Sequence, residues 1–183
     1  MAPSPVKAYV ALGSNLGDRQ AHLEAALAAL AESEAISVLR VSPIYETDPV
    51  DPAAVPAGGD AEVAGGDAEV AGGSQQRYLN AVAEIETTLD APTLLERLLC
   101  IEASRGRSRG PVANLARTLD LDLLLWGNSV IDLPGLAVPH PRMHQRSFVL
   151  DPLCDLVPDA VHPLLGETIA ALAQRARNLD GGP

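Results

Sequence analysis

Two aspartates separated by a single residue, Asp120 and Asp122, lie in a mostly apolar stretch at residues 117–125. The length of this stretch and the Gly127-Asn128 turn signal that follows it predict a buried strand. Because side chains alternate between the faces of a strand, both carboxylates point the same way, with Cα atoms roughly 6–7 Å apart. Two such carboxylates are costly to desolvate unless a cation lies between them, and Mg²⁺ accepts these oxygens while leaving positions for substrate phosphates. The alternative for an isolated Asp-x-Asp pair is a strand whose polar edge faces water.

Basic side chains that suit phosphate precede this strand. Arg105, Arg107, Arg109 and Arg117 lie in residues 105–117, which contain no acidic residue, although the whole chain carries a net charge of −11. Guanidinium groups offer forked, permanently charged donors for phosphate oxygens. Together with a metal-binding pair of aspartates, they are typical of phosphoryl transfer. The chain has neither the Gly-x-x-x-x-Gly-Lys-Ser/Thr phosphate loop nor the protein-kinase motifs, which indicates a less common class of nucleotide-using enzyme.

Length and composition indicate one globular domain that spans residues 1–183. Hydrophobic residues make up 47% of the chain and few of them are aromatic, so we expect a core of Leu, Val, Ile and Ala. The negative net charge disfavours a nucleic acid or an anionic membrane as the main partner. No apolar run reaches bilayer length, the N-terminus lacks signal-peptide features, and Cys100 and Cys154 have no metal-ligand spacing. We therefore expect a cytoplasmic protein.

The spacing of apolar residues predicts the elements that position these groups. Their order is βαββαβ, which favours an α+β fold with two helices on one face of an antiparallel sheet. In chain order we expect a strand at 7–12, a helix at 19–32 capped by Asp18, strands at 36–46 and 78–86, a helix at 92–104 opened by Asp90, the Asp120–Asp122 strand, two short β-like pieces after Asn128, a loop around Pro139-His140-Pro141, and a final helix near 167–177.

A perfect repeat separates the second and third expected strands. Residues 58–64 and 65–71 both read Gly-Gly-Asp-Ala-Glu-Val-Ala, and Gly72-Gly73 follows. One large hydrophobic residue per heptad, with paired glycines, cannot form a packed helix or strand, so residues 53–75 are expected to form a flexible loop insertion. Two copies are too few for a solenoid. A tandem duplication tolerated in a surface loop and a functional lid are both open interpretations.

Four segments, taken together, resemble a known enzyme family. They are residues 11–19 (Ala-Leu-Gly-Ser-Asn-Leu-Gly-Asp-Arg), 78–82 (Tyr-Leu-Asn-Ala-Val), 117–122 (Arg-Thr-Leu-Asp-Leu-Asp) and 139–150 (Pro-His-Pro-Arg-Met-His-Gln-Arg-Ser-Phe-Val-Leu). In this order they resemble 6-hydroxymethyl-7,8-dihydropterin pyrophosphokinase, which moves the terminal diphosphate of ATP to the pterin hydroxymethyl group in folate biosynthesis. The resemblance runs from about residue 7 to residue 176, interrupted by the repeat. It implies a ferredoxin-like α+β sandwich, in agreement with the βαββαβ order.

The resemblance implies roles for the charged residues. Asp120 and Asp122 match the ligands of two Mg²⁺ ions that bridge the ATP phosphates and offset charge on the attacked β-phosphate and the leaving AMP. Arg107 and Arg117 match the family's catalytic arginines, which bind the phosphates as charge shifts. Without the resemblance, the alternative for the histidine at position 140 is a capped loop residue. The residues that match ATP contacts are Glu102, Arg109, His140 and Arg146.

The resemblance also implies a pterin site. The pterin ring would stack on Phe148 and face the strand that begins at Tyr78, while Asn80 and the backbone around Thr47 read its amide-like edge. Without the resemblance, residues 13–17 fit a glycine turn from strand to helix as well as a substrate contact, and the phenylalanine fits a core aromatic. The residues that match pterin contacts are Gly13, Thr47, Val50, Tyr78, Asn80 and Phe148.

The chain departs from the family pattern just before Arg117. Family members usually carry Trp-Gly-Pro at this place, whereas this chain has Asn114-Leu115-Ala116. The missing tryptophan would help to close the loop over both substrates, so we expect slower closure. Two other functions stay open: a non-catalytic relative that binds pterin or nucleotide, and a ferredoxin-like hydrolase or nuclease that uses the Asp-x-Asp metals. For the pyrophosphokinase we expect a monomer with no nucleic-acid or membrane partner.

Overall fold

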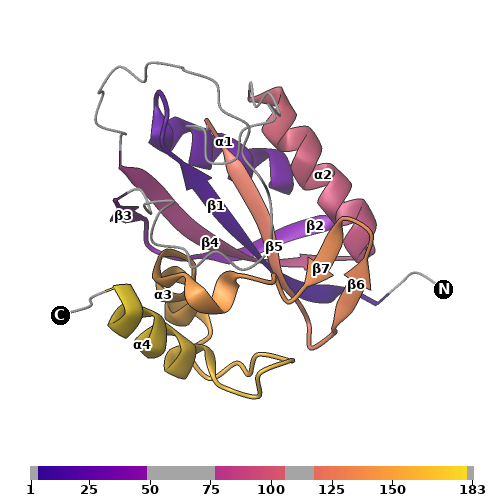
Figure 1. Ribbon diagram of the computed structural model, residues 1–183. Helices are drawn as coiled ribbons and strands as arrows, with labels where there is room; N and C mark the ends of the chain where they lie inside the picture. Colours follow the sequence, from indigo (N-terminus) through magenta and orange to yellow (C-terminus); the bar gives the residue numbers. More distant parts are fainter. Residues whose placement is uncertain (1–3, 49–76, 106–117, 181–183) are drawn as a thin grey trace, which may run out of the picture.

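A computed structural model of the protein describes residues 4–48, 77–105 and 118–180. An antiparallel sheet runs through the molecule in the order β2-β4-β1-β5, and the short strand β3 also pairs with β4 (Figure 1). A separate hairpin, β6–β7, follows the sheet. The elements are β1 (Val6–Ser14), α1 (Arg19–Ala31), β2 (Ile36–Val41), β3 (Tyr45–Thr47), β4 (Tyr78–Thr87), α2 (Ala91–Ser104), β5 (Asp120–Trp126), β6 (Ile131–Leu133), β7 (Leu136–Val138), the 3-10 turn η2 (Met143–Gln145), α3 (Ser147–Leu156) and α4 (Ile169–Asp180).

The helices α1 and α2 lie on one side of the sheet (Figure 1). Each begins at a capping aspartate: the side chain of Asp18 accepts a hydrogen bond from Ala21 N at 3.1 Å, and that of Asp90 accepts one from Thr93 N at 2.8 Å. These caps confirm the predicted helix starts. The core between helices and sheet includes Ala8, Val10 and Leu12 of β1, Leu23 and Leu30 of α1, Leu94 and Leu98 of α2, and Leu121 and Leu123 of β5.

The helices α3 and α4 cover the opposite face of the sheet (Figure 1). A bulge in β5 contributes to this second core. Val10 pairs with Leu123 and Tyr9 pairs with Leu125, so Leu124 is an extra residue, and both Leu124 and Leu125 belong to the second core. Its other members include Val82, Met143, Val149, Leu150, Leu153, Ile169, Leu172 and Ala173.

The predicted α+β fold with an antiparallel sheet is confirmed, but one predicted strand is wrong. Residues 36–46 do not form a continuous strand, because β2 ends at Val41 and β3 begins at Tyr45. Between them, Ser42 N donates to Val82 O at 2.9 Å and the Ser42 hydroxyl accepts from Val82 N at 3.0 Å. Pro43 has no N–H with which to extend a ladder. The break sets β3 beside the start of β4.

The apolar pattern gives no expectation of α3, which the structure forms at Ser147–Leu156. Pro152 lies inside this helix and removes one backbone donor, so the local sequence argues against a helix there. The helix forms because Val149, Leu150 and Leu153 are buried in the second core. The predicted β-like pieces after residue 128 are confirmed as the β6–β7 hairpin, and the predicted final helix is confirmed as α4.

Two predicted loops fall outside the described residues. The repeat-containing insertion at 53–75 lies within residues 49–76, and most of the arginine-rich segment lies within residues 106–117. The predictions made for them stay predictions. Among the residues that the structure describes, no helix is long and apolar enough to cross a membrane.

Candidate active site

One row of register partners crosses four strands of the sheet. Tyr45 of β3 pairs with Asn80 of β4, Asn80 pairs with Gly13 of β1, and Gly13 pairs with Asp120 of β5. Directly paired residues in an antiparallel sheet point to the same face. A Cβ added to Gly13 would lie 3.4 Å from Asn80 Oδ1 and 3.9 Å from Asp120 Cβ. Gly13 therefore places no side chain between the Asn80 amide and the Asp120 carboxylate on this face.

The next row of the sheet carries the second aspartate. Ala11 of β1 pairs with Asp122 on one side and with Val82 on the other. Both aspartates of β5 therefore lie on the face that α3 covers, as their spacing predicts. The Asp122 side chain is 38% exposed, so its carboxylate is open to a ligand from solvent.

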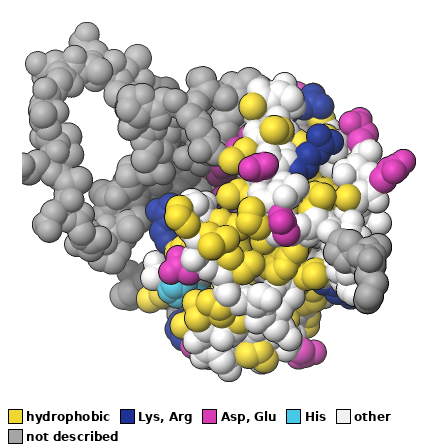
Figure 2. All heavy atoms as spheres, turned by 90° about the vertical axis from the view of Figure 1, so that its right-hand side faces the viewer, with side chains coloured by type: hydrophobic (Ala, Val, Ile, Leu, Met, Phe, Trp, Pro, Cys, Tyr) yellow, Lys and Arg dark blue, Asp and Glu magenta, His cyan; other side chains and the backbone are white. Residues whose placement is uncertain are grey.

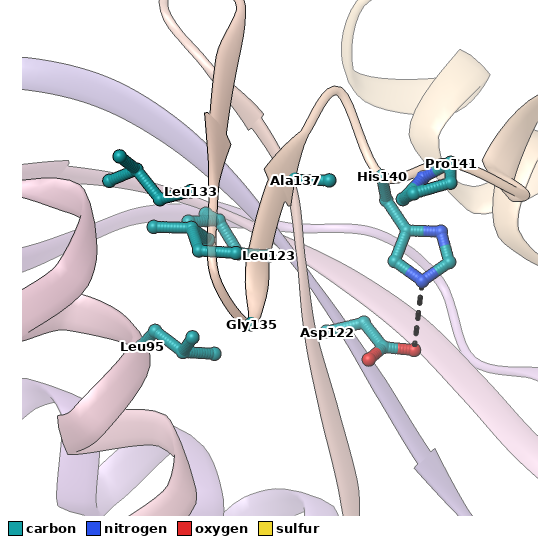
Figure 3. A pocket seen from close by; sticks show the side chains of 9 residues that line it. Leu95, Asp122, Leu123, Leu133, Gly135, Ala137, His140 and Pro141 are labelled. Carbon is teal, nitrogen blue, oxygen red and sulfur yellow. Dashed lines mark ion pairs between the residues drawn. The ribbon is translucent and has the colours of Figure 1, made fainter.

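His140 lies beside Asp122 because the backbone fixes the loop that carries it (Figure 3). His140 N donates to Leu124 O at 2.9 Å, and the peptide bond between Val138 and Pro139 just before it is cis. On the side chain, Nδ1 accepts from Arg142 N at 3.2 Å, which places the proton of the neutral ring on Nε2. The Nε2 atom is 3.9 Å from Asp122 Oδ2.

The environment of His140 keeps its imidazole neutral near pH 7. Burial is the main cause that lowers the pKa of His140 below its ordinary value; Arg146 and Arg142 also lower it, and the opposing effects of Asp122 and Asp120 are outweighed. A neutral ring with its proton on Nε2 can donate a hydrogen bond to a phosphate oxygen or to a hydroxyl group.

A pocket of about 360 Å³ opens beside this pair (Figure 3). Figure 2 views the side of the molecule that carries α2 and the β6–β7 hairpin, where hydrophobic side chains cover much of the surface. The pocket has an apolar end and a polar end, with Asp122 and His140 at the polar one. Its lining consists of Leu95, Asp122, Leu123, Leu133, Gly135, Leu136, Ala137, His140 and Pro141. The apolar end suits an apolar group, whereas the polar end carries the negative charge of Asp122 and suits a hydrogen-bonding group or a bound cation.

The predicted pterin contacts Thr47, Tyr78 and Asn80 come together at the junction of β3 and β4. Thr47 and Tyr78 are register partners, and Asn80 Nδ2 donates to Thr47 Oγ1 at 2.8 Å. Asn80 is buried, with 7% of its surface exposed. The sequence does not single out Tyr45, which is the register partner of Asn80. Its hydroxyl donates a hydrogen bond to Asp155 Oδ2 of α3 at 2.6 Å. This hydrogen bond is the main cause that raises the pKa of Tyr45 to about 12.

Arg146 and Phe148 lie at the start of α3. Phe148 is half-buried and packs against the second core, and Arg146 Cζ lies 5.6 Å from the centre of its ring. The structure thus places the phenylalanine partly in the core and partly at the surface. Its predicted stacking on a pterin stays a prediction.

Glu102, a predicted ATP contact, is buried at the end of α2 with 2% of its surface exposed. Its Oε1 atom accepts a hydrogen bond of 2.7 Å from Leu121 N, the amide between Asp120 and Asp122. The carboxylate therefore ties α2 to β5 between the two aspartates. The structure assigns it this anchoring contact, and its contact with a nucleotide is not tested.

Arg107, Arg109, Arg117 and Val50 fall outside the described residues. The structure does describe the residues that flank the arginine-rich segment. Thr118 Oγ1 donates to Arg105 O at 2.8 Å, and the buried hydroxyl of Ser14 donates to Thr118 O at 2.5 Å. The segment therefore begins and ends beside β1 and β5, next to the row that holds Gly13.

The sequence of the chain is similar to that of known pyrophosphokinases. A family model described as 7,8-dihydro-6-hydroxymethylpterin-pyrophosphokinase (HPPK) matches residues 9–158. The chain is 41% identical over 157 residues to the 2-amino-4-hydroxy-6-hydroxymethyldihydropteridine pyrophosphokinase of Pseudomonas aeruginosa, which covers 84% of this chain and 82% of that protein. It is also 41% identical over 153 residues to the enzyme of the same description from Bacillus subtilis, covering 81% of this chain and 77% of that protein.

A solved structure shares the fold. The crystal structure of wild-type Plasmodium falciparum HPPK-DHPS matches with a TM-score of 0.66 and 17% identity, covering 97% of this chain and 42% of that longer chain. At this identity the likeness shows the fold alone, and the chain spans less than half of that polypeptide. The family model and the relatives at 41% identity decide the membership: the chain belongs to the 7,8-dihydro-6-hydroxymethylpterin-pyrophosphokinase family.

Proposed function

We propose a role for each residue of this site in the reaction of the family. The chain is a pyrophosphokinase of hydroxymethyldihydropterin in folate biosynthesis, and the family implies ATP as the co-substrate. One observation carries the proposal: Asn80 and Asp120 lie on one face of the sheet, on either side of Gly13. A pterin-binding amide and a metal-binding carboxylate would thus meet over a residue that has no side chain.

Asp120 and Asp122 would hold two Mg²⁺ ions. Their carboxylates are hard oxygen donors on one face of β5, and the exposed fraction of Asp122 leaves room for phosphate and water ligands. No group of three or more potential metal ligands occurs among the described residues, which fits a metal that completes its coordination with substrate phosphates. When bound, Mg²⁺ would offset charge on the β-phosphate and on the leaving AMP.

ATP would lie with its base at the apolar end of the pocket and its phosphates at the polar end. Leu95, Leu123 and Leu136 offer the surface for the base, and Asp122 and His140 mark the direction of the phosphates. The Nε2–H group of His140 would donate a hydrogen bond to the nucleotide. Arg109 and Arg146 would add charged contacts, and Glu102 would contact the nucleoside or act through its hydrogen bond to β5.

The pterin would lie over the row that contains Gly13. Asn80 and the backbone around Thr47 would read its amide-like edge, and the hydrogen bond between their side chains fixes the position of both groups. Phe148 would stack on the ring. Tyr78 and Val50 would complete this pterin site.

In the reaction, the pterin hydroxyl oxygen would attack the β-phosphorus of ATP. A bond forms between the hydroxyl oxygen and the β-phosphorus, and the hydroxyl proton is released to water. The bond from the β-phosphorus to the bridging oxygen of the α-phosphate breaks, and AMP leaves with the bridging oxygen. Arg107 and Arg117 would bind the phosphates most strongly as the charge shifts toward AMP. The sheet residues bind and orient the two substrates, so the chain acts mainly through positioning and charge.

A product assay with purified protein, ATP, Mg²⁺ and the reduced hydroxymethylpterin tests the proposal. We expect one AMP for each pterin diphosphate. ADP or free phosphate as the product would instead indicate another phosphotransferase or a hydrolase. Tight pterin binding in the presence of an ATP analogue, without turnover, would indicate the non-catalytic relative and would locate the defect in residues 110–116.

We also propose the topology, the oligomeric state and the cellular compartment of the protein. The order β2-β4-β1-β5 with α1 and α2 on one face supports a ferredoxin-like βαββαβ sandwich within a single domain, to which the hairpin, α3 and α4 are added. Asn80, Gly13, Asp120 and Asp122 lie together within one chain, so the proposed site needs no second subunit, and we propose a monomer. Cys100 and Cys154 are free, as suits a reducing compartment such as the cytoplasm.

A further inference from the structure

Four charged side chains form a cluster around the two ends of the segment 49–76. Arg77, just before β4, donates from Nε to Asp48 Oδ1 at 2.8 Å and from NH1 to Glu46 Oε2 at 3.1 Å. Its third nitrogen, NH2, donates to the backbone oxygen of Glu46 at 3.2 Å. Arg19, the first residue of α1, donates from NH1 to Glu46 Oε1 at 2.9 Å and to Arg77 O at 2.6 Å. We call Arg19, Glu46, Asp48 and Arg77 the clasp.

The clasp surrounds a residue of the proposed pterin site. Thr47 lies between Glu46 and Asp48, and Arg77 contacts both of these neighbours. On the other side of Arg77, β4 begins at Tyr78, the register partner of Thr47. The side chain of Thr47 in turn accepts the hydrogen bond from Asn80. The clasp therefore fixes the backbone on both sides of the threonine hydroxyl that contacts Asn80.

The strand β3 needs such support because it is short. It has three residues, Tyr45–Thr47, and among the described strands it pairs with β4 alone. Its first residue is held by the hydrogen bond from the Tyr45 hydroxyl to Asp155 of α3. Both neighbours of its last residue, Glu46 and Asp48, belong to the clasp. Without the clasp, the described contacts at the end of β3 would be its ladder to β4 and the hydrogen bond from Asn80 to Thr47.

The charges of the clasp argue against direct binding of phosphate. Two guanidinium groups face two carboxylates, so the cluster is neutral as a whole. All three side-chain nitrogens of Arg77 already have acceptors within the protein. The cluster is therefore better suited to hold backbone in place than to attract ATP.

We propose that Arg77 and Glu46 are positioning residues for the pterin, which hold Thr47 beside Asn80 whatever the length of the segment between β3 and β4. This inference rests on the proposed pterin site. It assigns a role to charged residues that do not themselves contact substrate. The clasp also links Asp48 to Arg77, the described residues on either side of the segment 49–76.

The test is steady-state kinetics of Arg77→Ala with pterin and ATP varied in turn. We expect the KM for the pterin to rise about 3- to 10-fold, since exposed ion pairs are individually weak but act together here. The kcat and the KM for ATP should stay within about twofold, because the metal and nucleotide groups lie on β5 and beyond. Arg77→Lys should recover part of the loss. In a double-mutant cycle, Glu46→Ala and Arg77→Ala should be strongly non-additive.

Arg175→Ala is the matched control. Arg175 forms an ion pair with Glu167 at 2.7 Å, and its side-chain exposure of 46% is close to the 50% of Arg77. It should lower stability to a similar extent without changing the KM for the pterin. If Arg77→Ala fails to fold, Glu46→Gln serves as the second variant with the same expected result.

Different outcomes would contradict the positioning role and the proposed function. Folded Arg77→Ala or Glu46→Gln protein with an unchanged KM for the pterin would overturn the positioning role while leaving the reaction untouched. An equal loss for the pterin and for ATP would also overturn it, because it would indicate a general structural effect. Wild-type protein that forms no pterin diphosphate would instead overturn the proposed function itself.

Discussion

The substitution Gly13→Ala tests the arrangement of the site most directly, because Gly13 lies between Asn80 and Asp120. The added Cβ would lie 3.4 Å from Asn80 Oδ1 and 3.9 Å from Asp120 Cβ, so a methyl group makes only ordinary contacts in the free protein. Gly13 does not adopt a positive φ, so alanine brings no backbone strain. The methyl group would, however, stand on the face of the sheet against which the pterin is proposed to lie.

The expected magnitude follows from the cost of inserting a methyl group into filled space. That cost is about 1–3 kcal/mol, which corresponds to a decrease of about 5- to 150-fold in kcat/KM for the pterin. The free energy of unfolding should stay the same or rise by up to about 1 kcal/mol, because alanine restricts the unfolded chain more than glycine does. The KM for ATP should change little, since the nucleotide pocket lies beyond Asp122.

Initial rates of AMP formation at varied pterin and varied ATP measure these effects, and urea unfolding measures stability. A folded Gly13→Ala variant with the wild-type kcat/KM for the pterin would refute the placement of the pterin over Gly13. A large loss of stability would refute the second part of the reasoning, because it would show that the free protein has no room for a methyl group at position 13.

Other outcomes test the metal site, a buried ion pair and the insertion. Asp122→Asn keeps the side-chain shape but removes its charge, so turnover should fall by about 100-fold or more at an unchanged melting temperature, and near-normal turnover would contradict the metal assignment. Burial tends to raise the pKa of Glu84, but its hydrogen bonds and ion pairs with Lys7 and Arg40 outweigh this and lower the pKa. The stabilisation that this carboxylate provides is therefore present above its ordinary pKa of about 4.3 and is lost as the pH falls through the lower folded value. Urea unfolding between about pH 7 and pH 3 should show a steeper loss in the wild type than in Glu84→Gln, and parallel curves would refute this. Deletion of residues 58–73 should leave turnover within about twofold, because loop closure changes by only about 0.6 kcal/mol per doubling of length, and abolished activity would contradict this.

The parts of the site that lie on regular elements could be predicted from the sequence. Asp120 and Asp122 share a face because side chains alternate along β5, and this needs no knowledge of the rest of the chain. The helix starts at Asp18 and Asp90 could be predicted for a similar reason, since a cap acts within three residues. Such local rules also predicted an α+β fold with an antiparallel sheet, although the strand predicted at 36–46 is divided into β2 and β3.

The missed features depend on partners far away in the sequence. Pro152 argues against a helix locally, and α3 forms because Leu150 and Leu153 pack against the sheet. Likewise, the break after Val41 depends on Ser42, whose hydrogen bonds to Val82 cross forty residues of sequence. No local pattern contains this information.

The clasp could not be predicted from the sequence for the same reason, because its members come from parts of the chain that are far apart. Arg19, Glu46 and Arg77 are ordinary surface residues in the sequence, and Arg19 belongs to a motif whose glycines attract attention first. Only the fold joins them around Thr47. A signal was nevertheless present, because oppositely charged residues lie near the two ends of the insertion predicted at 53–75: Asp48 before it and Arg77 after it.

The proposed site contains residues on the sheet and residues of the segment 106–117, which lies outside the described part of the chain. Asn80 and the two aspartates belong to the first kind, and each has a register partner on β1. Arg107 and Arg117 belong to the second kind; next to that segment, Thr118 hydrogen-bonds to Arg105 and to Ser14. The departure at Asn114-Leu115-Ala116 lies entirely in the second kind. This departure should therefore change the steps in which the arginines act. It should change the affinity for the pterin, which is proposed to bind against the sheet, much less.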